Sequence, residues 1–90
     1  MNKIKICNML SGNGNKVPNQ FIISADDGQY FQSYDTIIAF QVNDGTLTLD
    51  AGKWDYSVTT SKYRNRFTGL SSKETRQKLT AGEIKLADLN

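Results

Sequence analysis

The chain has 90 residues, which is enough for one domain spanning residues 1–90 and for a thin core. It contains no histidine, which excludes Ser-His-Asp and Cys-His nucleophilic systems and the usual zinc sites. The net charge of +2 hides an asymmetry, because residues 46–90 carry eight Lys and Arg against five Asp and Glu. The basic character therefore belongs to the C-terminal half.

The N-terminal segment Lys3-Ile4-Lys5-Ile6-Cys7 alternates polar and apolar residues. This pattern predicts a short strand with Ile4 and Ile6 pointing inward. Residues 8–19 follow, and the run Ser11-Gly12-Asn13-Gly14-Asn15 gives them the composition of turns. We therefore expect residues 8–19 to form a loop.

The first residues also bear on the compartment. Cys7 is the only cysteine, so an internal disulfide cannot form, and a reducing cytoplasm is favoured. The alternating N-terminus lacks the unbroken apolar run of a signal peptide, and no segment reaches the length of a membrane-spanning helix. We expect a cytoplasmic protein that has no membrane partner.

The middle of the chain is rich in β-branched and aromatic residues, interrupted by Asp-Asp-Gly and Asn-Asp-Gly turns. This pattern predicts two hairpins, because such turns join antiparallel strands. The predicted strands are residues 20–24, 29–33, 36–42 and 46–50. Together they form a meander of four antiparallel strands, to which the N-terminal strand can add a fifth.

Beyond Gly52 the apolar period changes to that of a helix. Five residues recur at spacings of four and three and share one helix face. They are Tyr56, Thr60, Tyr63, Phe67 and Leu70. Ser71 and Glu74 have the spacing of a capping box for a second helix that Gly82 ends, and Ile84 and Leu86 then alternate as a last short strand. The fold class we predict is α+β: an antiparallel β-meander of four to five strands packed against two short C-terminal helices.

The stretch from Trp54 to Gly69 combines bases, aromatic rings and hydroxyls, which suits an anionic ligand. On a helical wheel, Lys62 and Arg66 lie on one flank of the apolar stripe and Arg64 on the other, so we expect a divided basic surface. The candidate ligand-binding residues are Ser57, Thr59, Thr60, Lys62, Arg64 and Arg66. Trp54 and Tyr56 can stack on bases. A solvated helix surface explains the same charges equally well.

The other polar residues point to ordinary structure. The aspartates of the hairpins are explained by turn chemistry rather than metal binding, and Asp35 and Asp55 are not placed together by any pattern. Residues 12–16 resemble a phosphate loop but lack its spacing. We therefore assign no catalytic residue, metal or cofactor, and we expect a protein that is not an enzyme.

Three blocks of the sequence resemble a family of small bacteriophage and prophage proteins of unknown function. They are residues 16–23, residues 30–39, and residues 54–67 together with the Asp88-Leu89-Asn90 ending. The most specific part is Tyr-Ser-x-Thr-Thr-x-Lys-Tyr-Arg-Asn at Tyr56–Asn65. The resemblance implies a viral origin and action in the cytoplasm of a bacterial host. It supplies no activity and no catalytic residues.

Two hypotheses follow. In the first, a phage accessory protein binds nucleic acid or a nucleotide signal and interferes with a host process such as antiviral defence. In the alternative, the protein inhibits a host enzyme or immune complex, as anti-CRISPR proteins do, through a sheet edge or the aromatic strand Tyr30–Tyr34. Homo-oligomerisation is compatible with both, because a thin core and exposed strand edges favour it.

Overall fold

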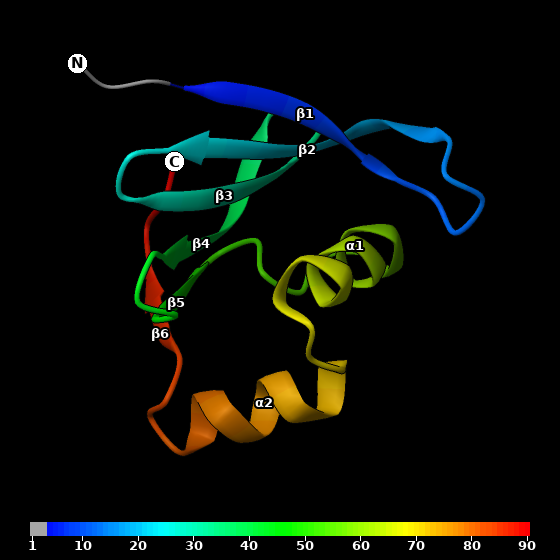
Figure 1. Ribbon diagram of the computed structural model, residues 1–90. Helices are drawn as coiled ribbons and strands as arrows, with labels where there is room; N and C mark the ends of the chain where they lie inside the picture. The colour runs from blue at the N-terminus through cyan, green and yellow to red at the C-terminus, as the bar shows by residue number, and fades with distance from the viewer. Residues whose placement is uncertain (1–3) are drawn as a thin grey trace.

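Within residues 4–90, six strands form one sheet, in which they lie in the order of the chain (Figure 1). The computed structural model describes residues 4–90. The strands are β1 (Lys5–Leu10), β2 (Lys16–Ala25), β3 (Gly28–Ser33), β4 (Thr36–Val42), β5 (Leu47–Asp50) and β6 (Lys85–Ala87). Two helices, α1 (Val58–Thr68) and α2 (Ser72–Thr80), lie between β5 and β6 in the chain.

The α+β class is confirmed, but the sheet has six strands rather than the predicted four to five. The first five strands pair antiparallel, and β6 adds to β5 in parallel. A parallel neighbour needs a long crossover connection, and α1 and α2 supply it here. Hairpin turns in a sequence reveal only antiparallel neighbours. The sequence therefore predicted a last strand near β6 but not its parallel pairing with β5.

The predicted loop over residues 8–19 is too long. β1 pairs with β2 from Lys5 opposite Ser24 to Asn8 opposite Phe21, and Leu10 pairs with Lys16 after an irregularity. Only residues 11–15 separate the two strands. Strand pairing depends on the neighbouring backbone, which turn-favouring residues in the sequence do not reveal.

The prediction that Ile4 and Ile6 point inward is wrong. Their side chains are 68% and 63% exposed. β1 is an edge strand. The next pair along it, Cys7 with Ile22, faces the core, because Ile22 packs against the core cluster. Ile6 and its partner Ile23 therefore lie on the sheet face opposite to the helices. Alternation shows that a strand has two different faces but does not show which face the helices cover. Lys3, also assigned to this strand, lies outside the described residues.

The core lies between the sheet and the two helices. Its buried apolar residues are Met9, Phe31, Ile38, Ala39, Leu47, Leu49 and Ile84. Tyr63, Phe67 and Leu70 pack against this cluster, as their helical spacing predicted. In β4, Ile38 is an extra residue, because Phe31 pairs with Ala39 and Gln32 pairs with Ile37. The bulge allows two consecutive residues of β4, Ile38 and Ala39, to be buried together.

Both helices begin at serine caps. The Ser57 hydroxyl accepts a hydrogen bond from the Thr60 amide, and Ser71 with Glu74 forms the predicted reciprocal capping box. Gly69 ends α1 in the left-handed conformation, with φ of 77°. The caps fix where each helix starts, and thereby which residues lie where α1 and α2 approach each other.

Asp50 at the end of β5 holds the C-terminal segment. Its buried carboxylate accepts hydrogen bonds from the Leu89 amide at 2.9 Å, the Asn90 side chain at 3.1 Å and the Gly52 amide at 3.2 Å. The bond from the Leu89 amide is the largest effect on the Asp50 pKa, and despite partial desolvation the pKa lies below its ordinary value. The ionised carboxylate therefore stabilises this arrangement.

We predict that the free energy of unfolding depends on pH through Asp50. Because the folded pKa is lowered, the contribution is complete above the unfolded pKa of about 3.9 and is lost as the pH falls through the folded pKa. Asp50→Asn should lower the free energy of unfolding by about 1–3 kcal/mol at neutral pH and weaken its acid dependence. Urea unfolding at neutral and acidic pH measures both effects. An identical loss on acidification in the two proteins would contradict this role.

Candidate functional site

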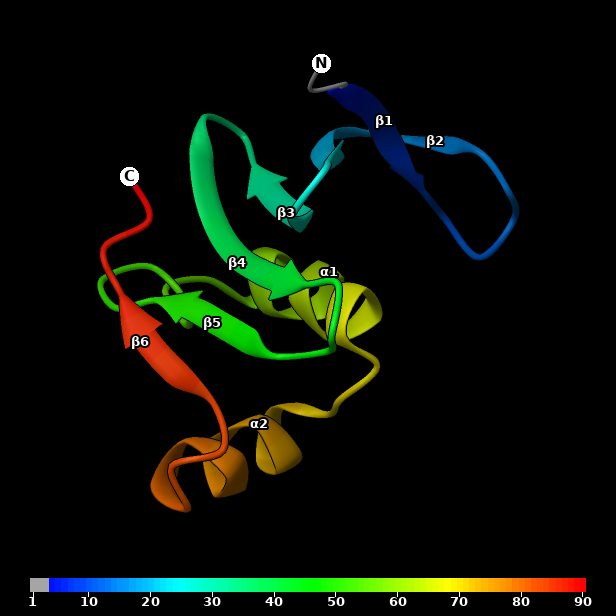
Figure 2. The same cartoon turned by 60° about the vertical axis from the view of Figure 1, so that its left-hand side comes forward.

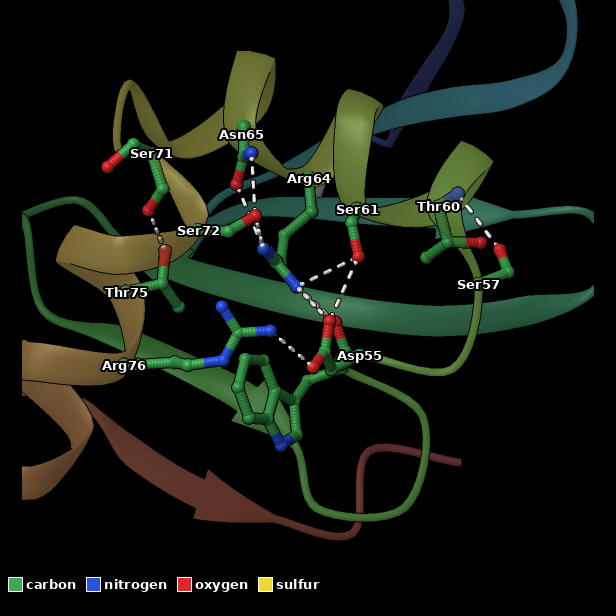
Figure 3. Close-up of polar contacts among 11 residues, drawn as sticks. Asp55, Ser57, Thr60, Ser61, Arg64, Asn65, Ser71, Ser72, Thr75 and Arg76 are labelled. Atoms are coloured by element: carbon green, nitrogen blue, oxygen red, sulfur yellow. Dashed lines mark hydrogen bonds and ion pairs between the residues drawn. The ribbon is translucent and has the colours of Figure 1, made fainter.

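Arg64 is inside the protein, not on its surface. The helical wheel predicted an exposed residue, but the side chain has 0% exposure. Its guanidinium lies where α2 and the loop before α1 cover that flank of α1 (Figure 3). Its carbon Cζ is 5.3 Å from the centre of the Trp54 ring. A wheel describes one helix at a time, so it could not show that a second helix closes this side.

The guanidinium of Arg64 connects three segments. Nη1 donates to the Trp54 carbonyl oxygen at 2.6 Å and to Ser61 Oγ at 3.4 Å, and Nη2 donates to Asn65 Oδ1 at 2.9 Å and Ser72 Oγ at 3.0 Å. Nε has no hydrogen-bond partner among residues 4–90. Desolvation lowers the Arg64 pKa, and the attraction of Asp55 opposes that shift. A charged group is thus buried where the pre-helix loop, α1 and α2 meet.

Asp55 is the acidic partner of this group, and two arginines share it. Its Oδ1 is 3.6 Å from Arg64 Nη1 and accepts from Ser61 Oγ, while Oδ2 accepts from Arg76 Nη2 at 3.0 Å. Desolvation raises the pKa of Asp55, but the hydrogen bonds from Arg76 and Ser61 and the two arginine charges outweigh it, so the pKa is lowered. One negative charge thus faces two positive charges.

A cleft of about 540 Å³ opens beside this network, between α1 and α2. It is lined by residues 55–58 of the pre-helix loop and the start of α1, by Ser61, Lys62 and Asn65 of α1, and by Ser72 and Arg76 of α2. Four of the lining residues bind the Arg64 guanidinium directly: Asp55, Ser61, Asn65 and Ser72. With Lys62 included, the cleft and the group behind it carry three positive charges and one negative charge.

The cleft offers hydrogen-bond donors whose partners are missing. Ser72 Oγ accepts from both Arg64 Nη2 and Asn65 Nδ2, and within residues 4–90 its own hydroxyl hydrogen has no acceptor. Ser57 Oγ likewise accepts from the Thr60 amide without donating to any described residue. Both carboxylate oxygens of Asp55 are already occupied. Free donors and excess positive charge together suit an anion.

The structure brings together only some of the residues singled out in the sequence. Ser57, Tyr56 and Lys62 line the cleft, and Trp54 contacts the buried Arg64 guanidinium. Thr59 is exposed and does not line it.

Two further candidates lie elsewhere. Thr60 is buried, and its Oγ1 is 3.1 Å from Ser33 Oγ of β3. Arg66 is exposed and donates to the Leu10 carbonyl oxygen at 2.8 Å, so it lies beside the end of β1.

Sequence reasoning missed Ser61, Asn65, Ser72 and Arg76. The sequence does contain a pattern that could have identified them: residues 57, 61 and 65 are spaced four apart, and so are residues 72 and 76. Each set therefore forms one row along a helix face. What the sequence does not reveal is that these two rows face each other.

No group of three or more His, Cys, Asp or Glu side chains is arranged to hold a metal ion within residues 4–90. Over the same residues, neither helix is long and apolar enough to cross a membrane.

We predict that Arg64 is required for stability. Arg64→Met should lower the free energy of unfolding by about 3–5 kcal/mol, because it leaves Asp55 and the Trp54 carbonyl without their buried partner. Arg64→Lys should also destabilise the protein, since one ammonium cannot replace two guanidinium nitrogens that bind four groups. Lys73→Ala, at an exposed position of α2, is the control and should change stability by less than about 0.5 kcal/mol. Urea unfolding that finds Arg64→Lys as stable as the wild type would refute this role.

Comparison with known proteins places the chain in a family without assigning an activity. No curated protein and no solved structure matches it. The model of a family of unknown function, DUF8033, matches residues 4–83, which is most of the chain. The protein therefore belongs to the DUF8033 family.

Proposed function

We propose that this protein is a non-enzymatic binding protein that holds the phosphate group of a nucleotide in the cleft between α1 and α2. The observation that carries the proposal is that the hydroxyl groups of Ser57 and Ser72 at the cleft accept hydrogen bonds but donate none to residues 4–90. Ser72 Oγ already accepts two hydrogen bonds, so it can offer a ligand only its O–H group as a donor. Ser57 Oγ accepts one hydrogen bond, and its O–H group is also free to donate. Phosphate oxygens are acceptors and fit this arrangement.

The charges favour the same ligand. Lys62 is exposed at the cleft and forms no ion pair among the described residues, and Arg76 is 57% exposed beside Asp55. The N-terminus of α1, capped by Ser57, borders the cleft, and Ser72 opens α2 on the other side. Helix N-termini carry partial positive charge, which adds to the attraction for a phosphate group.

Tyr56 provides a surface for a nucleobase. It lines the cleft and is 47% exposed, and the Lys53 ammonium lies 5.2 Å from its ring centre. An exposed aromatic ring beside a phosphate-binding cleft can stack on a base. Lys62 and Arg76 are the basic residues that line this single cleft, which has the size of a small-molecule site and therefore favours a single nucleotide over a polymer.

The biological setting is part of the proposal. Residues 56–65 resemble small phage proteins, and we propose that the protein acts in the cytoplasm of an infected bacterium. There it would sequester a nucleotide signal and so interfere with a host process such as antiviral defence. Sequestration needs binding without turnover, which agrees with a site built of hydroxyls and basic side chains around one carboxylate that Ser61 and Arg76 already bind.

A protein-binding role is the second candidate. The outer edge of β1 is unpaired within residues 4–90, and Tyr34 is 55% exposed with a positive φ of 57°. A free strand edge can pair with a strand of another protein. A host enzyme or immune complex captured there would remain bound when Lys62 is replaced, which separates this role from nucleotide binding.

We predict that nucleoside monophosphates and diphosphates bind with an affinity that Lys62→Glu reduces at least tenfold, by about 1.4 kcal/mol or more. Ser57→Asp should also abolish binding, because aspartate retains the helix cap but replaces the hydroxyl donor with a negative charge. Isothermal titration calorimetry measures both effects.

Two matched variants serve as controls. Lys85→Glu makes the same charge change on β6, and Ser71→Asp makes the same cap exchange on α2 at a residue that does not line the cleft. Both should bind like the wild type. An oligonucleotide bound with a steep salt dependence would identify nucleic acid as the ligand. Nucleotide binding unaffected by Lys62→Glu and Ser57→Asp, or no binding of any probe, would contradict the proposal.

A further inference from the structure

The cleft between α1 and α2 carries a net positive charge of two units. Both helices lie on the same side of the sheet (Figure 2), and the charged groups of the cleft come from them and from the loop before α1. Lys62 and Arg76 line the cleft, and Arg64 lies buried behind it. Among the described lining residues Asp55 is the one that is acidic, and its carboxylate is shared by Arg64 and Arg76. Three positive charges against one negative charge leave a charge of +2.

Phosphate groups differ in charge according to the number of their ester bonds. A terminal phosphate, which has one ester bond, has a second pKa of about 6 and carries close to two negative charges at pH 7. The phosphate of a diester, as in a cyclic nucleotide or within an oligonucleotide, carries one negative charge. The terminal phosphate is therefore the group whose charge matches that of the cleft.

The hydrogen-bond donors of the cleft favour the same group. The O–H groups of Ser57 and Ser72 have no acceptor within residues 4–90, and Lys62 and Arg76 add N–H groups on both helices. A terminal phosphate has three oxygens that are free of ester bonds, whereas a diester has two. It can therefore accept hydrogen bonds from more of the groups that line the cleft.

We propose that the ligand of this cleft is a nucleotide with a terminal phosphate in its doubly charged form, and that the cleft discriminates against cyclic nucleotides and other phosphodiesters. This inference rests on the proposed function, because it specifies the class of nucleotide that the cleft holds. At equal distance, two negative charges are attracted to the same positive groups about twice as strongly as one.

The charges of the protein at the cleft are constant between pH 5 and pH 7.5. Among residues 4–90, the titratable groups there are Asp55 and Tyr56 of the pre-helix loop, Lys62 and Arg64 of α1, and Arg76 of α2. Lysine, arginine and tyrosine remain protonated in this range. Asp55 remains ionised, because its pKa lies below the ordinary value. The chain contains no histidine, so a pH dependence of binding in this range comes from the phosphate of the ligand.

Calorimetric titration with AMP and with the methyl ester of its phosphate tests the inference. The two ligands share base and ribose and differ by one methyl group, which removes one negative charge. At pH 7.5 AMP should bind at least tenfold more tightly than the ester. The affinity for AMP should fall about tenfold between pH 7.5 and pH 5, because only about a tenth of its phosphate is doubly charged at pH 5. The affinity for the ester should not change.

A pair of lysine variants checks that the cleft is the source of this preference. Lys62→Gln removes one positive charge from the cleft and should reduce the preference for AMP over the ester at least threefold. Lys73→Gln makes the same change at an exposed position of α2 that does not line the cleft, and it should keep the full preference.

The possible failures are distinguishable. If AMP and its ester bind within threefold of each other, or if the affinity for AMP is the same at pH 7.5 and pH 5, the inference is overturned and the proposed function stands. If neither ligand binds, the proposed function fails and the inference fails with it. A preference that Lys62→Gln leaves unchanged would place the discrimination outside the cleft and would also overturn the inference.

Discussion

The burial of one guanidinium group determines how the helical half of this protein is arranged. Arg64 has no exposed surface, and it is held by a backbone carbonyl before α1, two side chains of α1 and a hydroxyl of α2. A buried charge is tolerated only when hydrogen bonds and a counter-charge surround it. The two helices therefore approach each other at Arg64. The side chains that bind its guanidinium, Asp55, Ser61, Asn65 and Ser72, also line the cleft between the helices.

The same interaction gives the cleft its chemistry. Because Arg64 and Asn65 donate to Ser72, the serine presents a hydrogen to the cleft instead of a lone pair. Because Asp55 is shared by Arg64 and Arg76, its charge does not cancel theirs. An interaction that stabilises the fold thus also leaves donors and positive charge at the surface, which is the combination that a phosphate group needs.

Local features of the structure could be predicted from the sequence, whereas contacts between elements could not. The hairpins, the caps at Ser57 and Ser71 and the packing of Tyr63 and Phe67 follow from spacing and turn residues, which act over a few positions. The burial of Arg64, the exposure of Ile6 and the place of β6 depend on what lies against each element. The candidate site divides in the same way: Ser57 and Lys62 were found on one helix, and Ser72 and Arg76 become part of the site only because α2 folds back onto α1.

The most direct test of this account is a titration of the ¹⁵N-labelled protein with a nucleoside monophosphate, followed by two-dimensional NMR. If the cleft organised by Arg64 holds the phosphate, the amide signals that shift will be those of residues 57–65 and 71–76, and the side-chain Nε signal of Arg64 will shift with them. Signals of the loop at residues 11–15 will not move. Shifts centred on that loop and on Arg66 would place the anion at the basic residue of α1 that lies outside the cleft and would contradict the account.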